Sequence, residues 1–127
     1  MVQVNGVNID PLLKTYNKFE EFRHDLKTEK DNAAAIHAFE YCFELVWKTM
    51  QRLLEARGKY ADSPREAFRM AALANFIDDP EIWFDFLKMR NLTVHTYNED
   101  TAKRVVSVFP KFSNKIAQFL DKIQYNR

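Results

Sequence analysis

The sequence predicts an all-α fold: a single domain, residues 1–127, built as an up-and-down antiparallel bundle of about five helices. A chain of 127 residues is long enough for one hydrophobic core and short for two. It has only 2 glycines and 4 prolines, too few for the many tight turns of an all-β sandwich or barrel. Its hydrophobic residues recur mostly at spacings of three and four, the period of an amphipathic helix.

The first nine residues have two interpretations. Hydrophobic residues alternate with polar ones around Asn5-Gly6, a pair that favours the turn of a β-hairpin. Residues 1–9 are also short enough to form a frayed N-terminal arm before the first helix. Both interpretations remain open, because a hairpin of this length would not be stable alone.

Two long helices are expected after this segment. Asp10 is suited to the N-cap and Pro11 to the first helical position, and hydrophobic residues at helical spacing continue to Leu26. Asp31 is expected to cap a second helix that runs until Gly58, a residue type that commonly follows the end of a helix. The hydrophobic positions of this second helix cover a wide sector, so we expect it to pack on two sides.

Three further helices are expected in the second half of the chain. The sequence Ser-Pro-Arg-Glu at residues 63–66 is a capping box, and it starts a short helix that ends at about residue 76. Asp-Pro-Glu at residues 79–81 starts the next helix, which leads into residues 89–97. After a polar break, a last helix carries hydrophobic residues as far as Ile123. Pro110 lies within it and should kink it, because proline has no N–H to donate.

Arg90 interrupts the hydrophobic stripe of the fourth expected helix. The residues that share its face are Trp83, Phe86, Leu87 and Val94. A guanidinium therefore stands where packing is expected, and a buried charge is costly unless it is paired. Arg90 either extends to solvent, or pairs with a carboxylate such as Glu40 or Glu44, or lies at a cleft wall to receive an anion.

His95 is the second candidate functional residue. It lies about 140° around a regular helix from Arg90, so the two side chains would not share a face. They converge only if the helix ends near Thr93 or if they come from different subunits. The β-branched residues in segment 93–96 favour an early end of the helix.

Two neighbours of His95 complete the candidate site. Asn91 lies four residues earlier, where its side chain could hydrogen-bond an imidazole nitrogen and fix the tautomer. Tyr97 lies seven residues after Arg90, which would keep its hydroxyl near the same site in a continuous helix. The other two histidines are weaker candidates, because they belong to polar helix faces.

Charge and cysteine content exclude several classes of protein. Lys and Arg number 19 against 18 Asp and Glu, so no overall field favours nucleic acid, and neither DNA nor a membrane is an expected partner. The single cysteine excludes a disulfide framework and fits a cytoplasmic protein. No secretory segment opens the chain. No metal-binding or cofactor-binding motif is present, so neither a metal site nor a cofactor is predicted.

Two segments resemble a known family. The sequence Met-Arg-Asn-Leu-Thr-Val-His-Thr-Tyr at residues 89–97 closely resembles the R-x4-H-x-Y signature of the HEPN superfamily. Residues 38–48 resemble the long helix of one branch, the nucleotidyltransferase substrate-binding proteins. The resemblance covers nearly the whole chain except residues 1–9. It implies a helical bundle that forms a homodimer and is encoded beside a minimal nucleotidyltransferase.

The resemblance implies two alternative functions. Some relatives are metal-independent endoribonuclease toxins, with the minimal nucleotidyltransferase as antitoxin. Carried over by position, Arg90 and His95 would be the catalytic pair acting on RNA, Asn91 a polar supporter, and Tyr97 the residue to which the partner adds AMP. Other relatives are non-enzymatic subunits that present substrate or nucleotide to a transferase. The intact motif favours the ribonuclease, and since one His95 cannot readily act as both base and acid, we predict an active homodimer.

Overall fold

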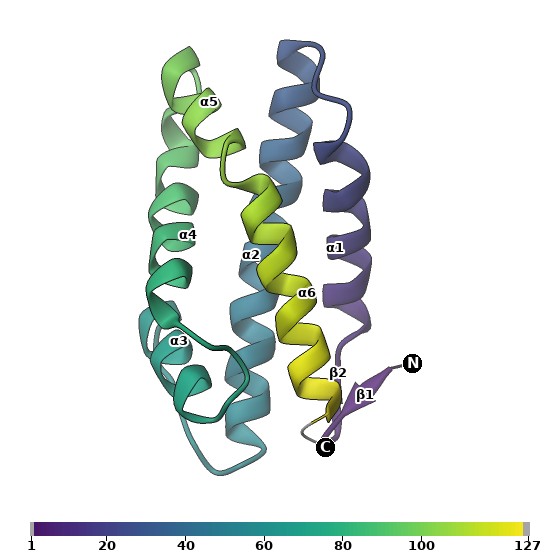
Figure 1. The fold of residues 1–127 in the computed structure, drawn as a ribbon, viewed down its shortest axis with the longest axis vertical. Helices are drawn as coiled ribbons and strands as arrows, with labels where there is room; N and C mark the ends of the chain where they lie inside the picture. The colour runs from purple at the N-terminus through teal and green to yellow at the C-terminus, as the bar shows by residue number, and fades with distance from the viewer. Residues whose placement is uncertain (1, 126–127) are drawn as a thin grey trace.

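The structure is a computed structural model that describes residues 2–125, and it consists mainly of helices arranged up and down (Figure 1). All five predicted helices are present, and the fifth is divided into two segments. The helical segments are α1 (Asp10–Arg23), α2 (Glu29–Glu55), α3 (Pro64–Leu73), α4 (Pro80–Leu92), the 3₁₀ turn η1 (Thr93–His95), α5 (Glu99–Val106) and α6 (Phe109–Tyr125). The predicted mostly helical bundle is therefore confirmed.

The N-terminal segment forms a small β-hairpin. Strand β1 (Gln3–Val4) pairs antiparallel with β2 (Val7–Asn8), and the turn residues Asn5 and Gly6 have φ values of +52° and +81°. Both turn residues thus have the positive φ that a type I′ hairpin turn needs. The hairpin is held to the bundle because Val4 and Ile9 are buried in the hydrophobic core. Met1 lies outside the described residues.

Two of the predicted helix starts are wrong in detail. The N-cap of α1 is Ile9, not Asp10, because strand β2 runs directly into the helix and draws Ile9 into the core. The N-cap of α2 is Thr28, not Asp31. The Thr28 hydroxyl accepts from the N–H of Asp31, and the Asp31 carboxylate accepts from the N–H of Thr28, which makes a complete capping box. The N–H of Lys27 also donates to this carboxylate, and these hydrogen bonds lower the pKa of Asp31.

The predicted kink at Pro110 is instead a break between two helices. Helix α5 ends at Val106 and α6 begins at Phe109, so Pro110 lies in the first turn of α6. A proline is tolerated there, since the first N–H groups of a helix have no partner within it. Helix α2 ends at Glu55, three residues before the predicted Gly58, but Gly58 does close the last turn: it has a φ of +75°, and its N–H donates to the carbonyl of Glu55.

Interlocking phenylalanine rings fill the centre of the bundle. Phe112 of α6 lies 4.8 Å from Phe39 of α2 and 5.1 Å from Phe86 of α4, measured between ring centroids. Phe19 of α1 packs edge-on against Phe112 at 5.4 Å. Helix α2 contacts α1, α3, α4 and α5, so the prediction that it packs on two sides is confirmed. This central helix also carries carboxylates toward α4.

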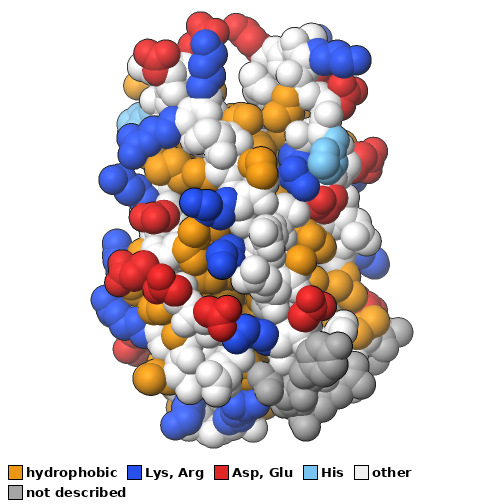
Figure 2. Space-filling model, viewed as in Figure 1, with side chains coloured by type: hydrophobic (Ala, Val, Ile, Leu, Met, Phe, Trp, Pro, Cys, Tyr) orange, Lys and Arg blue, Asp and Glu red, His pale blue; other side chains and the backbone are white. Residues whose placement is uncertain are grey.

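The surface shows no segregation of charge by sign on the face seen in Figure 2, where basic and acidic side chains alternate. At the end of the bundle where α2 begins, this view shows a hollow with hydrophobic side chains at its floor. None of the described helices is sufficiently long and apolar to cross a membrane.

Candidate functional site

Arg90 lies near the C-terminal end of α4 and faces two carboxylates of α2. Its Nη1 is 3.7 Å from Oε2 of Glu40, and its Nε is 3.8 Å from Oε1 of Glu44. The Arg90 side chain is 27% exposed, which makes pairing necessary. The sequence left several alternatives open for Arg90, and the structure shows the ion pair. Arg90 pairs with both Glu40 and Glu44 rather than with one of them.

Thr93 completes the contacts of Arg90. The guanidinium Nη1 donates to the Thr93 hydroxyl at 3.3 Å, and that hydroxyl donates to the Arg90 carbonyl at 2.7 Å. The Nε of Arg90 is buried and has no hydrogen bond within the described residues. Thr93 was expected only as a residue that ends the helix. The signal in the sequence that Thr93 also holds the Arg90 side chain was its position, because a hydroxyl three residues after a half-buried arginine can reach the guanidinium.

The helix ends between Arg90 and His95, as the sequence predicted. Helix α4 stops at Leu92, and residues 93–95 form a tighter 3₁₀ turn. The Thr96 hydroxyl donates to the Thr93 carbonyl at 3.0 Å, and Asn98 caps α5 immediately afterwards. These local hydrogen bonds compete with the α-helical ladder, which explains the early stop.

Within residues 2–125 of one chain, no hydrogen bond or ion pair joins Arg90 to His95. Arg90 is half-buried against α2, whereas His95 and Asn91 are exposed. The rings of His95 and Tyr97 approach edge to face, with centroids 6.0 Å apart, and Tyr97 is 87% exposed. No hydrogen bond joins Asn91 to His95 in residues 2–125, so its role in fixing the tautomer stays a prediction.

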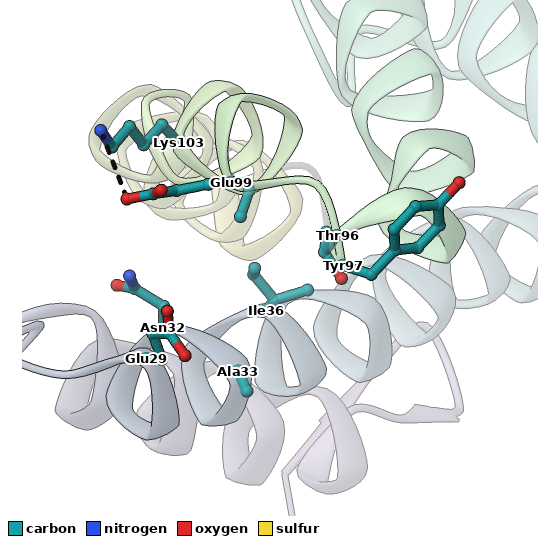
Figure 3. A pocket seen from close by; sticks show the side chains of 9 residues that line it. Glu29, Asn32, Ala33, Ile36, Thr96, Tyr97, Glu99 and Lys103 are labelled. Carbon is teal, nitrogen blue, oxygen red and sulfur yellow. Dashed lines mark ion pairs between the residues drawn. The ribbon is translucent and has the colours of Figure 1, made fainter.

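A groove of about 310 Å³ lies beside Tyr97, between the start of α2 and α5. Figure 3 shows Asn32 and Ile36 of α2 on one side and the Glu99–Lys103 ion pair of α5 on the other. The Tyr97 ring points away from the groove. No sequence pattern indicated this groove, because its walls come from segments far apart in the chain that only the fold brings together.

The remaining candidate groups have structural surroundings. His24 lies 3.7 Å from Glu20 on the preceding helical turn, and the ring of His37 packs against a tyrosine. Cys42 is buried, and burial raises the pKa of its thiol to about 12, so it stays protonated at neutral pH. Within the part of the chain that the structure describes, no three His, Cys, Asp or Glu side chains cluster as metal ligands would.

Comparison with known proteins places this geometry in a family. The family described as "Nucleotidyltransferase substrate binding protein like" matches residues 8–125. The chain belongs to this family. The match includes the two segments, 38–48 and 89–97, on which the resemblance rested, and it starts at the end of the hairpin.

One relative of this chain is named as a ribonuclease. Probable ribonuclease HepT from Haemophilus influenzae is 29% identical over 97 residues, which is 72% of this chain and 66% of HepT. The matched part therefore spans just under two thirds of that relative.

Two solved structures superpose closely. HI0074 of Haemophilus influenzae, described as the substrate-binding domain of a nucleotidyltransferase, has a TM-score of 0.82 at 25% identity and covers 92% of this chain and 99% of its own. A protein from Thermus thermophilus has the same TM-score at 29% identity, covering 88% of this chain and 98% of its own. The fold of the nucleotidyltransferase substrate-binding protein family is thus the fold of this chain.

Proposed function

We propose that this chain is a metal-independent endoribonuclease, the toxin of a two-gene module whose antitoxin is a minimal nucleotidyltransferase. The observation that carries the proposal is the end of α4. Arg90 is held by Glu40 and Glu44 just before the helix stops, and His95 stands exposed just after it. The distant relative named probable ribonuclease HepT supports the same function.

The two side chains supply complementary chemistry. Cleavage at the 2′-hydroxyl of RNA needs a base for that hydroxyl, an acid for the leaving 5′-oxygen, and stabilisation of the phosphorane-like transition state. His95 would be the base or the acid, and Arg90 would stabilise the negative charge. The described contacts of Arg90 involve Nε and Nη1, which leaves the N–H groups of Nη2 to donate to a phosphate.

A homodimer would supply both a contact between Arg90 and His95, which a single chain lacks within residues 2–125, and a second proton-transfer group. Two-fold symmetry would bring two copies of each residue into one cleft, with the dimer forming a heterotetramer when the antitoxin binds. Val94, between the two residues, is 68% exposed and would lie in the surface that a second copy covers. Full cleavage by a variant shown to be monomeric by analytical ultracentrifugation would contradict the dimer.

Tyr97 would be the residue that the nucleotidyltransferase modifies with AMP. Its side chain is 87% exposed, and its ring lies beside that of His95. AMP at this hydroxyl would place a bulky anion next to the catalytic group and compete with the RNA phosphate. Mass spectrometry of protein co-expressed with the transferase should find one added AMP on Tyr97; unmodified Tyr97 in fully inhibited protein would instead indicate inhibition by occlusion.

RNA cleavage in the presence of EDTA tests the ribonuclease directly. Purified wild-type protein should cleave single-stranded RNA, and His95→Ala should lose about 10²–10⁴-fold in rate, the usual contribution of a general acid or base. His24→Ala is the matched control, because His24 is exposed on a different part of the bundle. Equal cleavage by the wild type and by His95→Ala would contradict the catalytic role of His95.

The groove beside Tyr97 favours a second candidate function, a non-enzymatic subunit that binds substrate or nucleotide for a nucleotidyltransferase. Its volume of about 310 Å³ and its mixed polar and hydrophobic walls suit a nucleotide-sized molecule. Isothermal titration with AMP should then detect binding that Asn32→Leu weakens, and the purified protein should cleave no RNA. RNA cleavage that depends on His95, without nucleotide binding, would exclude this alternative.

A further inference from the structure

Two arginines of α3 converge on one aromatic ring of α4, away from the candidate site. The guanidinium carbons of Arg65 and Arg69 each lie 5.2 Å from the centroid of the Phe84 ring. Both arginines are exposed, and no ion pair joins either one to a carboxylate within residues 2–125. Phe84 is itself anchored, because its ring contacts that of Phe68 at 6.3 Å. The arrangement is a fixed ring that carries two unpaired positive charges.

This arrangement is unfavourable for the isolated chain in one respect. Arg65 and Arg69 are like charges four residues apart on a helix, so they repel one another. No ion pair with a carboxylate in residues 2–125 offsets this repulsion. Stacking on an aromatic ring orients a guanidinium but leaves its N–H groups at the edge free to donate. An anion that receives those hydrogen bonds would remove the repulsion. One helical turn separates the two arginines, a spacing comparable to that between adjacent phosphates of an RNA strand.

The ring also lies at the start of an exposed stripe that leads toward His95. Phe84, Lys88 and Asn91 occupy one face of α4 at offsets of zero, four and seven, and Lys88 and Asn91 are exposed. His95 follows in the 3₁₀ turn η1, just beyond the end of α4. Along the edge formed by α4 and α3, Figure 2 shows a row of basic side chains with acidic ones among them.

Carboxylates limit where an anion could run on this face. Glu81 and Asp85 are exposed on α4, three residues before Phe84 and three before Lys88, so they border the stripe on its Lys88 side. They would repel a phosphate backbone there, so the favourable path would run along the Asn91 side of Phe84 and Lys88. The exposed arginines lie on an aromatic ring, and Lys88 continues the line of positive charge toward His95. This pattern fits RNA better than a protein surface, because RNA has a negatively charged phosphate at every nucleotide.

We propose that Arg65 and Arg69, stacked on Phe84, form a phosphate-binding site that continues over Lys88 and guides an RNA strand along α4 to His95. This inference rests on the proposed ribonuclease function, because it takes RNA as the substrate. It also explains how a chain of nearly zero net charge would bind RNA: the positive charges that matter lie on one edge.

Binding of RNA to the cleavage-deficient His95→Ala protein separates this inference from the catalytic proposal. Fluorescence anisotropy with a labelled single-stranded RNA of about 20 nucleotides measures affinity as a function of salt. Adding R65Q and R69Q together should weaken binding about tenfold at low salt and reduce the slope of log K against log salt by about 1.4, as expected for two lost phosphate contacts. R65K and R69K together keep both charges and should retain most of the slope.

Lys14 and Lys18 provide a matched control pair. They are exposed, four residues apart on α1, on the opposite side of the bundle, and Lys18 also lies near an aromatic ring. K14Q with K18Q removes the same charge and should leave the affinity unchanged. Equal losses in the two pairs, or none in either, would overturn the phosphate-binding site.

Two further outcomes keep the proposals distinct. If the arginine pair variant binds RNA normally but no longer binds the nucleotidyltransferase, the edge is a protein contact and the inference is wrong. If RNA binding depends on the arginine pair but wild-type protein cleaves no RNA, the phosphate-binding site stands and the ribonuclease fails. Thermal melting followed by circular dichroism should show a cooperative transition for every variant, so that each is folded at the temperature of the binding measurement.

Discussion

Helix α2 serves two regions of the molecule that are stabilised in different ways. Phe39 and Phe43 are buried in the aromatic core, whereas Glu40 and Glu44, the very next residues, face Arg90 at the end of α4. The core is stabilised by many contacts between aromatic rings, each of which is individually weak. At the end of α4, a few directed contacts hold one guanidinium. Side chains in the first region position the helices, and side chains in the second are available for chemistry.

The largest effect is expected from Phe112→Ala, which empties the centre of the core. Phe112 contacts rings from α1, α2 and α4, so its loss should lower the free energy of unfolding by about 3–5 kcal/mol. Urea unfolding followed by circular dichroism measures this change. Val94→Ala, at a 68% exposed position near the candidate site, should change stability by less than about 0.5 kcal/mol. Similar losses in both variants would contradict the division between the two regions.

Arg90→Met tests whether the ion pairs at the end of α4 exist for stability or for function. Methionine keeps the length of the side chain but leaves Glu40 and Glu44 without their cation; water can still solvate these carboxylates, because their side chains are 31% and 38% exposed. We expect the free energy of unfolding to change by less than about 1 kcal/mol while RNA cleavage is lost.

Arg23→Met is the control for that variant. Arg23 also pairs with a glutamate, Glu20, but on α1 and far from the candidate site in sequence. It should retain cleavage. If Arg90→Met instead unfolded the protein and left the residual activity per folded molecule unchanged, Arg90 would be a structural residue.

Much of the fold was predictable from sequence because local signals agreed with one another. The spacing of hydrophobic residues located the helices, and Ser63 and Asp79 are N-caps as expected. The errors arose where tertiary contacts competed with a local signal. Ile9 became the N-cap of α1 because the hairpin packs on the core, and Pro110 fell in a helix start because α5 ends before it.

The candidate site was predictable in composition but not in arrangement. A charged residue on a hydrophobic stripe identified Arg90, and Glu40 and Glu44 were named as possible partners in one of the alternatives that the sequence left open. The groove beside Tyr97 and the stacking of Arg65 and Arg69 on Phe84 were not foreseen. Both depend on side chains from different helices, and the relative placement of helices is not encoded in any single segment.

Glu20 links the core to the pH dependence of stability. Burial alone would raise its pKa, but hydrogen bonds from Arg23 and Ser113 hold the pKa below the ordinary value of 4.5. The folded state therefore favours the carboxylate, and its contribution is complete above pH 4.5 and is lost as the pH falls through the lowered pKa. Glu20→Gln should lower stability at pH 7 by about 1 kcal/mol or less and flatten the decline in acid. Parallel pH profiles for both proteins would contradict this role.

Tyr97→Phe should have the smallest effect on stability and so gives the sharpest contrast with Phe112. The Tyr97 hydroxyl has no hydrogen bond in the described part of the chain, and its side chain is 87% exposed, so its removal should change the free energy of unfolding by less than about 0.5 kcal/mol. The variant should nonetheless cleave RNA after co-expression with the nucleotidyltransferase, because it offers no hydroxyl to receive AMP. Such a result would mean that the Tyr97 hydroxyl does not stabilise the fold but is required for the nucleotidyltransferase to inhibit RNA cleavage. Inhibition of Tyr97→Phe by the transferase to the same extent as the wild type would show that silencing does not pass through this hydroxyl.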